Sequence, residues 1–348
     1  MSTWLELKNN PRLKKIYDER IKIIRLIREF FWSLGFVETD TPIALKLPGQ
    51  EPYLNPVAIN IHDPNGQTEK FYGRTSPEFA LKKLLAVGYE KIFELAKSFR
   101  DYESFGGNHN TEFIMLEWYR APGKYQDFMD DMENLFKYIG EKLDVKTIKY
   151  KNKEINFFEK WDRLTMKEVW QKYLQVNLDD YLETESLRNL AAKLGLSVSA
   201  NDSYDDIFFT IFLNKIEANL GLEKPIFIYD YPAQMASLSR NCEYDQRYAE
   251  RVECYIGGLE MCNGYGELTD AKEQKRRLEQ DRELRAKLGK DVWDVDPDFI
   301  AALADLPEPA QKAMAGVALG VERMVVLFTG AKDINEVIFQ AVKDQINN

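Results

Sequence analysis

The chain has 348 residues, of which 45% are hydrophobic and 30% charged, so it can bury a large core and has the composition of a soluble globular protein. Its formal net charge of −10 argues against a broad nucleic-acid-binding surface, because binding a polyanion depends on clustered lysine and arginine. It holds no uncharged apolar run of about 20 residues and no signal-peptide pattern, so we expect a cytoplasmic protein without membrane contact. Cys242, Cys254 and Cys262 lack paired spacing, which argues against structural zinc and a disulfide framework.

Local signals predict most of the elements in chain order. Asn10 and Pro11 offer a cap and a first-turn proline for a long amphipathic helix that reaches Leu34. A short strand over 36–40 follows and is stopped by Pro42. The next predicted elements are loops with a hairpin over 45–73, a helix over 74–88 capped by Thr75 or Ser76 with Pro77 in its first turn, helices over 124–143 and 271–287, a hairpin over 146–158, helices with breaks over 164–220, and a strand over 226–231.

The stretch 92–119 is typical of a strand, an irregular loop and a second strand. A half-solvated sheet would explain the polar face of this hairpin, as in many antiparallel sheets. Phe113 and Tyr119 are costly to leave in water, however, so a face covered by a ligand is a competing interpretation. The side chains predicted to share this face are Glu94, Ala96, Ser98, Arg100, Phe113, Met115, Glu117 and Tyr119.

A second hairpin is predicted around the turn Gly257–Gly258. A regular two-residue turn pairs Ile256 with Leu259, Tyr255 with Glu260, Cys254 with Met261, and Glu253 with Cys262. Glu253 and Glu260 would then lie on one face, on the order of 7 Å apart. Two carboxylates this close repel, so they share a cation or each pairs with an arginine.

Several of these residues together suggest a nucleotide site. Gly320 joins a small-residue strand to a helix with Arg323 in its first turn, which lets an anion approach closely. Arg100 and Arg323 would hold phosphates, Glu253 and Glu260 a metal, and Phe113 a base, as Mg²⁺ and a nucleoside triphosphate require. Three further carboxylates beside Tyr119 have no role in this nucleotide site: Glu78, Glu117 and Glu267. They indicate a second, cationic ligand such as an amine or diamine. Glu78 could instead simply balance the dipole of its helix.

Three segments resemble the signature motifs of class II aminoacyl-tRNA synthetases: Pro42 after the long helix, SFRDYE with HNTEFIMLEWY, and GVALGVERM. TSPEFALKKLL and GLEMCNGYGELTDA resemble the lysyl-tRNA synthetase branch, and the likeness covers nearly the whole chain. The resemblance implies an α+β fold in which an antiparallel sheet is flanked by helices. It also implies one catalytic domain over 1–348, a helical insertion at about 164–222, and a homodimer formed through the first motif.

The chain begins at the helix of the first motif, so we expect no N-terminal anticodon-binding barrel. It therefore resembles the truncated branch of the family, ligases that attach a lysine-type residue to a lysine of elongation factor P. Ala318 stands where the synthetases have glycine, and the resemblance implies that its methyl group adapts the pocket to (R)-β-lysine. Ordinary packing of a small residue is the alternative explanation.

The resemblance also assigns roles to matching positions. Arg100 would bind the α-phosphate and the carboxylate, and Arg323 the γ-phosphate. The expected ATP-binding residues are Arg100, Asp101, Tyr102, Glu103, His109, Asn110, Phe113, Glu260, Met261, Gly320 and Arg323, with Glu253 and Glu260 for Mg²⁺. The expected amino-acid-binding residues are Ser76, Pro77, Glu78, Glu117, Tyr119, Asn263, Glu267 and Ala318.

The second motif departs from the family pattern of arginine, any residue, glutamate. Tyr102 occupies the glutamate position, Glu103 follows one place later, and the loop is longer by one residue. We expect Glu103 to take over the contact with adenine.

The leading hypothesis is a ligase that uses ATP and Mg²⁺ to activate lysine or (R)-β-lysine and then transfers it to elongation factor P. Charging of tRNA by a minimal synthetase is a second hypothesis, disfavoured by the expected lack of an anticodon domain and by the acidic balance. A catalytically silent paralogue that binds an amino acid is a third, motivated by the altered second motif.

Overall fold

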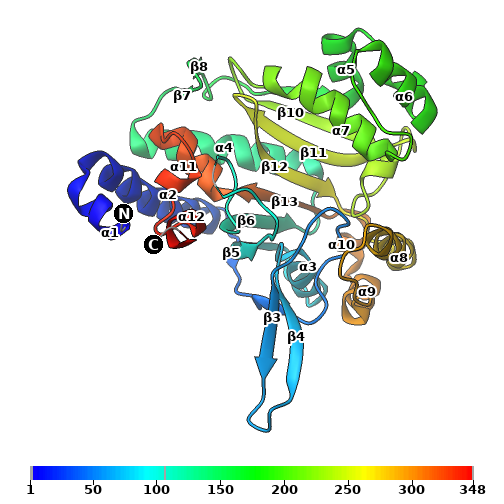
Figure 1. Cartoon of the computed structure of the whole chain (residues 1–348), viewed down its shortest axis with the longest axis horizontal. Helices are drawn as coiled ribbons and strands as arrows, with labels where there is room; N and C mark the ends of the chain where they lie inside the picture. The colour runs from blue at the N-terminus through cyan, green and yellow to red at the C-terminus, as the bar shows by residue number, and fades with distance from the viewer. Residues whose placement is uncertain (1–2, 106, 347–348) are drawn as a thin grey trace.

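The computed structural model describes residues 3–105 and 107–346. Its main sheet is built, within these residues, from β1 (Val37–Glu38), β5 (Lys91–Phe99), β6 (Glu112–Arg120), β9 (Asp162–Thr165), β10 (Ile226–Pro232), β11 (Tyr248–Ile256), β12 (Leu259–Gly266) and β13 (Ala315–Gly320). The strands lie in the order β1–β5–β6–β13–β12–β11–β10–β9 (Figure 1). Neighbours are antiparallel except for the outermost pairs, β1 with β5 and β9 with β10, which are parallel. The predicted antiparallel sheet flanked by helices is therefore confirmed, with a parallel pair at each edge.

One face of the sheet is covered by α2 (Pro11–Ser33), α4 (Tyr125–Leu143) and α11 (Val321–Thr329). The α2 helix begins as the sequence predicts, because the Asn10 side chain accepts hydrogen bonds from the backbone of the first turn. Phe31 of α2 stacks on Phe93 of β5 with ring centroids 5.0 Å apart. A buried ion pair of 2.8 Å between Arg20 and Glu322 joins α2 to α11. These contacts hold α2 against β5 and against α11.

Helices α3 (Glu78–Ala86), α8 (Ala271–Lys287) and α9 (Pro297–Ala304) pack together around a smaller apolar cluster. Phe79 and Phe299 stack with ring centroids 3.9 Å apart. The predicted helix over 271–287 has these bounds, and its residue Arg285 is buried against the ring of Trp293.

The helices predicted between 164 and 220 are α5 (Met166–Leu174), α6 (Thr184–Lys193) and α7 (Tyr204–Lys215). They bury their own apolar cluster against β10 and β11 (Figure 1). Their placement beside the sheet brings the N-terminal end of α7 to the candidate site. The interpretation of 164–222 as an insertion stays a prediction.

Smaller elements complete the described part of the chain, and a long hairpin of β3 and β4 projects from it (Figure 1). These elements are α1 (Thr3–Asn9), β2 (Ala44–Leu45), β3 (Ala58–His62), β4 (Thr68–Gly73), β7 (Ile148–Tyr150), β8 (Lys153–Ile155), α10 (Glu308–Lys312) and α12 (Val342–Ile346). The sequence signals did not predict α1. Among the described helices, none combines the length and apolar character that crossing a membrane requires.

Two local predictions need correction. The helix α3 begins at Glu78, so Pro77 is its cap residue rather than part of its first turn, although the Ser76 hydroxyl does accept a hydrogen bond from the Glu78 backbone. The second hairpin does not keep a regular register: an irregularity between Cys254 and Tyr255 pairs Cys254 with Cys262. Such a bulge shifts every pair beyond it by one residue.

Candidate active site

The register of four strands gathers polar side chains on one face of the sheet. Glu117 of β6 lies opposite Ala318 of β13, which in turn lies opposite Asn263 of β12. Beyond the bulge, Asn263 pairs with Glu253 of β11. Because side chains alternate between the two faces of a sheet, these four share the face opposite to α2 and α4. The side chain of Asn263 therefore reaches the site because of the bulge.

A second row lies two residues further along the same strands. Tyr119, Gly316, Tyr265 and Arg251 are register partners across it. A Cβ atom on Gly316 would lie 2.1 Å from the Tyr119 ring and 2.7 Å from a carboxylate oxygen of Glu267. Glycine is therefore required there for the tyrosine and the glutamate to pack into the site.

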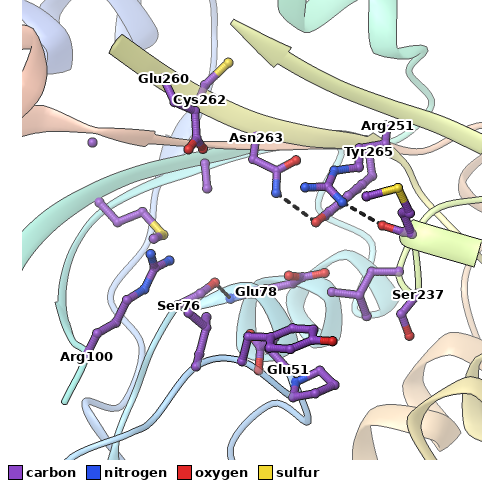
Figure 2. Close-up of a pocket in the computed structure, with 18 of the residues that line it drawn as sticks. Glu51, Ser76, Glu78, Arg100, Ser237, Arg251, Glu260, Cys262, Asn263 and Tyr265 are labelled. Carbon is purple, nitrogen blue, oxygen red and sulfur yellow. Dashed lines mark hydrogen bonds between the residues drawn. The ribbon is translucent and has the colours of Figure 1, made fainter. Parts of the chain in front are cut away.

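A cavity of about 690 Å³ opens above this face. In Figure 2, Arg100 and Glu260 lie at one side, Ser76 and Glu78 in the middle, and Ser237 and Arg251 at the other side. The predicted site residues that line it are Ser76, Glu78, Arg100, Glu103, His109, Asn110, Phe113, Glu260, Met261, Asn263, Ala318, Gly320 and Arg323. Those that do not line it are Pro77, Asp101, Tyr102, Glu117, Tyr119, Glu253 and Glu267.

Two arginines mark one end of the cavity. The Arg100 guanidinium lies over the Phe113 ring at 5.2 Å, and its Nε atom is buried without a hydrogen-bond partner among the described residues. Arg323 donates to the Glu260 carbonyl at 2.7 Å. Burial lowers the pKa of Arg100, while nearby carboxylates, Glu260 first among them, oppose that shift. Arg100 can therefore offer an anion at this end a donor, Nε, that no other described residue occupies.

The loop after β5 accommodates the change in the second motif, in which Tyr102 occupies the glutamate position. Tyr102 adopts a left-handed backbone conformation with φ of 60° and is 88% exposed, so its side chain leaves the cavity. Glu103 turns inward instead, and its carboxylate lies 2.8 Å from His109 Nδ1. Asn110 lines the cavity, but its side chain accepts a hydrogen bond from the Val342 backbone and donates one to the Glu112 carbonyl.

Buried charges lie beneath the middle of the cavity. The Lys82 ammonium is fully buried and lies 2.5 Å from a carboxylate oxygen of Glu78 and 2.6 Å from one of Glu267. Glu117 accepts hydrogen bonds from Ser76 at 2.8 Å and from Tyr119 at 2.7 Å. Burial, with a contribution from Glu78, raises the pKa of Glu117 to about 8.

We expected a bound ligand to supply the cation for Glu78, Glu117 and Glu267, and the position of Lys82 corrects this expectation. The chain supplies one cation itself, so three carboxylates and one ammonium leave two formal negative charges when all are ionised. The sequence contained a signal for this, because Glu78 and Lys82 are four residues apart on one helix.

The sequence left two arrangements open for Glu253, a shared cation or an arginine partner, and the structure shows the arginine partner. Its carboxylate pairs with Arg251 at 2.7 Å and accepts hydrogen bonds from Tyr231 at 2.5 Å and Tyr255 at 2.6 Å. Both oxygens are thus engaged inside the chain. Within the described residues, no cluster of three or more His, Cys, Asp or Glu side chains could hold a metal ion.

Comparison with known proteins identifies the family to which this geometry corresponds. The model of the class II tRNA synthetases (D, K and N) matches residues 1–343. The chain belongs to this family. An elongation factor P–(R)-β-lysine ligase of Proteus mirabilis is 37% identical over 92% of the chain and 93% of its own length. A ligase of the same name from Salmonella paratyphi B is 36% identical over 97% of both chains.

The Gly316 contact can be tested by Gly316→Ala. We expect the free energy of unfolding to fall by about 1–3 kcal/mol, the usual cost of overpacking, because the new methyl group would overlap Tyr119. Urea denaturation measures this free energy of unfolding. The matched control is Gly320→Ala on the same strand, where the nearest atom would lie 3.6 Å away, an ordinary contact. Equal stabilities of the two variants would contradict the steric role of Gly316.

Proposed function

We propose that the chain is an ATP-dependent ligase that activates lysine or (R)-β-lysine and transfers it to a lysine side chain of elongation factor P. The observation that carries the proposal is a single cavity with the buried guanidinium of Arg100 at one end and a buried cluster of three carboxyl groups and one ammonium beneath its middle. The acceptor, elongation factor P, and the amino acid, (R)-β-lysine, are taken in this proposal from the names of the relatives. A single catalytic domain and a cytoplasmic location also remain predictions.

The buried cluster suits a diamine with a carboxylate. Lysine and (R)-β-lysine each carry two ammonium groups, which match the two formal negative charges left by Glu78, Glu117, Glu267 and Lys82. The carboxylate would lie near Arg100 and Asn263. Ala318 stands between Glu117 and Asn263 in the register, so its methyl group would narrow the space beside the carbon chain of the bound amino acid. A narrower space supports discrimination between lysine and (R)-β-lysine, and (R)-β-lysine is the proposed substrate.

The arginine end suits ATP. Arg100 Nε has no hydrogen-bond partner within the described residues, Phe113 offers a ring face, and Arg323 lies in the first turn of α11, after Gly320. Glu260 lines the cavity and would hold Mg²⁺ together with phosphate oxygens, whereas Glu253 as a second ligand stays a prediction because both of its oxygens are engaged. Bound Mg²⁺ would supply positive charge at the phosphates. The contacts of Asp101, Met261, His109 and Asn110 with nucleotide also stay predictions.

The reaction then needs positioning rather than a protein nucleophile. The amino-acid carboxylate would attack the α-phosphorus of ATP and release pyrophosphate, with Arg100 stabilising the charge that develops. The acceptor amine would next attack the activated carbonyl carbon, form an amide bond and release AMP. Glu117 and its neighbours hold the ammonium groups throughout, so the carboxylate is presented in one orientation.

The deciding experiment is ATP–pyrophosphate exchange with lysine, (R)-β-lysine or no amino acid, each with and without Mg²⁺. We expect Mg²⁺-dependent exchange, stimulated most by (R)-β-lysine. Arg100→Ala should lower exchange by about 100-fold or more, as loss of a charge-stabilising donor does, whereas Arg25→Ala, on the exposed side of α2, should retain it. Absence of exchange with every amino acid would refute the ligase, and loss of labelled product after ribonuclease treatment would indicate tRNA charging.

The raised pKa of Glu117 predicts a pH dependence. Below about pH 8 this carboxyl group carries a proton that a bound ammonium must displace, so affinity should rise as pH increases towards that value. We expect the Kd of lysine, measured by calorimetry, to fall about tenfold between about pH 6.5 and 8.5. Glu117→Gln should weaken binding and make the profile shallower, while Glu267, whose pKa burial also raises to about 8, continues to titrate. A flat profile in the unmodified protein would contradict the assigned pKa.

A homodimer is the proposed assembly. Ile21 and Trp32 are eleven residues apart on α2, about three helical turns, so they share a face, and they are 56% and 50% exposed. Val37 on β1 is 45% exposed nearby in the chain. Ile21→Glu with Trp32→Glu should convert a dimer to a monomer in sedimentation equilibrium, while Leu213→Glu on α7, with a similarly exposed apolar residue, should not. A monomer before any substitution would contradict the proposal.

A further inference from the structure

The loop after β2, residues 48–54, forms the wall of the cavity that faces the sheet. Figure 2 shows its residue Glu51 on the wall opposite Glu260 and Asn263. Tyr53 of the same loop lines the cavity and is 47% exposed, so the loop also borders the opening to solvent. A side chain that enters the cavity here passes this segment, which we call the entrance loop. Its residues that line the cavity are Gln50, Glu51, Pro52, Tyr53 and Leu54.

Hydrogen bonds from α8 and the segment after it hold the backbone of the entrance loop. The Arg285 side chain donates to the Glu51 carbonyl at 2.6 Å and to the Leu54 carbonyl at 2.8 Å. Trp293 Nε1 donates to the Pro48 carbonyl at 2.7 Å. A Cβ atom on Gly49 would lie 2.4 Å from a carboxylate oxygen of Glu51, so glycine leaves the space which that carboxylate occupies. The position of Glu51 is therefore set by the fold before a ligand binds.

The carboxylate of Glu51 has no cation of its own. Among the described residues it forms no ion pair, and the donor that stabilises its charged form is its own backbone N–H. Burial raises the pKa of Glu51, and the charge of Glu78 adds to the shift. The more distant charges of Arg100 and Arg285 oppose it. A carboxylate with a raised pKa accepts a proton more readily than an ordinary glutamate does.

Glu51 lies close to the place where the activated carbonyl would form. Burial lowers the pKa of Arg100, and the charges of Glu260 and then Glu51 oppose that shift. Glu51 is thus near Arg100 as well as Glu78, because interactions between charges weaken with distance. In the proposed function Arg100 holds the carboxylate of the amino acid, and Glu78 belongs to the cluster that holds its ammonium groups. The reacting carbon would lie between these two residues, on the side that Glu51 faces.

We propose that Glu51 is the general base of the transfer step and takes a proton from the acceptor nitrogen as this nitrogen bonds to the activated carbonyl carbon. The inference rests on the proposed function and adds a catalytic residue to its second step. The first step needs no base, because the amino-acid carboxylate attacks the α-phosphorus without losing a proton. Glu51 should therefore matter for transfer and not for ATP–pyrophosphate exchange.

The protons of the acceptor lysine determine what the base has to do. A lysine side chain in water has a pKa of about 10.4, so its ammonium first loses one proton to solvent. When the neutral amine forms the C–N bond, its nitrogen becomes positively charged and passes a second proton to a carboxylate oxygen of Glu51. The C–O bond to the phosphate then breaks, and its electron pair leaves with AMP. Glu51 returns the proton to water at the entrance loop.

The test measures two rates in Glu51→Gln, which keeps the size of the side chain but cannot accept the proton. One is ATP–pyrophosphate exchange with (R)-β-lysine, and the other is single-turnover transfer from the preformed adenylate to saturating elongation factor P. We expect the transfer rate constant to fall about 100-fold or more, the usual contribution of a general base, with exchange unchanged. Glu51→Asp, which keeps a carboxylate, should recover part of the transfer. The matched control is Glu279→Gln, an exposed carboxylate on α8, which should alter neither rate.

The pH profile of transfer supplies a readout that a structural role would not move. Transfer should slow as pH falls, because less of the acceptor amine is neutral, and should slow more steeply below the pKa of Glu51, where the base is protonated. Glu51→Gln should lose this steeper limb. The charged groups that face Glu51, which are Glu78 of α3, Arg100 after β5 and Arg285 of α8, remain in the variant. The difference between the two profiles therefore reports Glu51.

The outcomes separate this inference from the proposed function. An unchanged transfer rate constant in Glu51→Gln, with exchange intact, would overturn the role of Glu51 alone. A fall of exchange in parallel with transfer would assign Glu51 to the binding of ATP or the amino acid and would also overturn it. So would a change confined to the KM for elongation factor P, since that would indicate a docking contact. Absence of exchange in the unmodified protein would overturn the proposed function and this inference with it.

Discussion

The register of β6, β13, β12 and β11 determines where the side chains of the candidate site lie. Because side chains alternate strictly, a slip of one residue would send a whole row to the opposite face. The bulge between Cys254 and Tyr255 makes such a slip locally: it turns Cys262 towards the core and brings Asn263 opposite Glu253. Gly316 then supplies the space into which Tyr119 packs. A polar site on an otherwise apolar sheet depends on these two backbone features.

The same face has to bury several charges, and Lys82 makes this possible. Three buried carboxylates without a cation would repel one another and be costly to desolvate. With Lys82 between Glu78 and Glu267, the chain offsets part of that cost before any ligand binds. Burial, with a contribution from Glu78, raises the pKa of Glu117 to about 8 although the hydroxyl groups of Ser76 and Tyr119 oppose the shift, and burial raises the pKa of Glu267 to about 8 as well.

Local signals were sufficient for most elements, because caps, prolines and periodicity act over a few residues. Asn10 with Pro11 predicts the start of α2, and the bounds of α8 follow from its charged pattern. The bulge could not be predicted in this way, since Gly257–Gly258 specifies a regular hairpin; the family resemblance identified Asn263 where the idealised register did not. The spacing of Glu78 and Lys82 on α3 was a local signal for one ion pair, whereas the pair between Lys82 and Glu267 joins distant segments, which no local pattern encodes.

Charge changes sign along the cavity, and this gives its two ends different chemistry. Arg100 and Arg323 form a positive end, whereas Asp205 and Asp281 form a negative one, with the amino-acid cluster between them. In a low-dielectric cleft such a gradient orients charged ligands more strongly than any single contact.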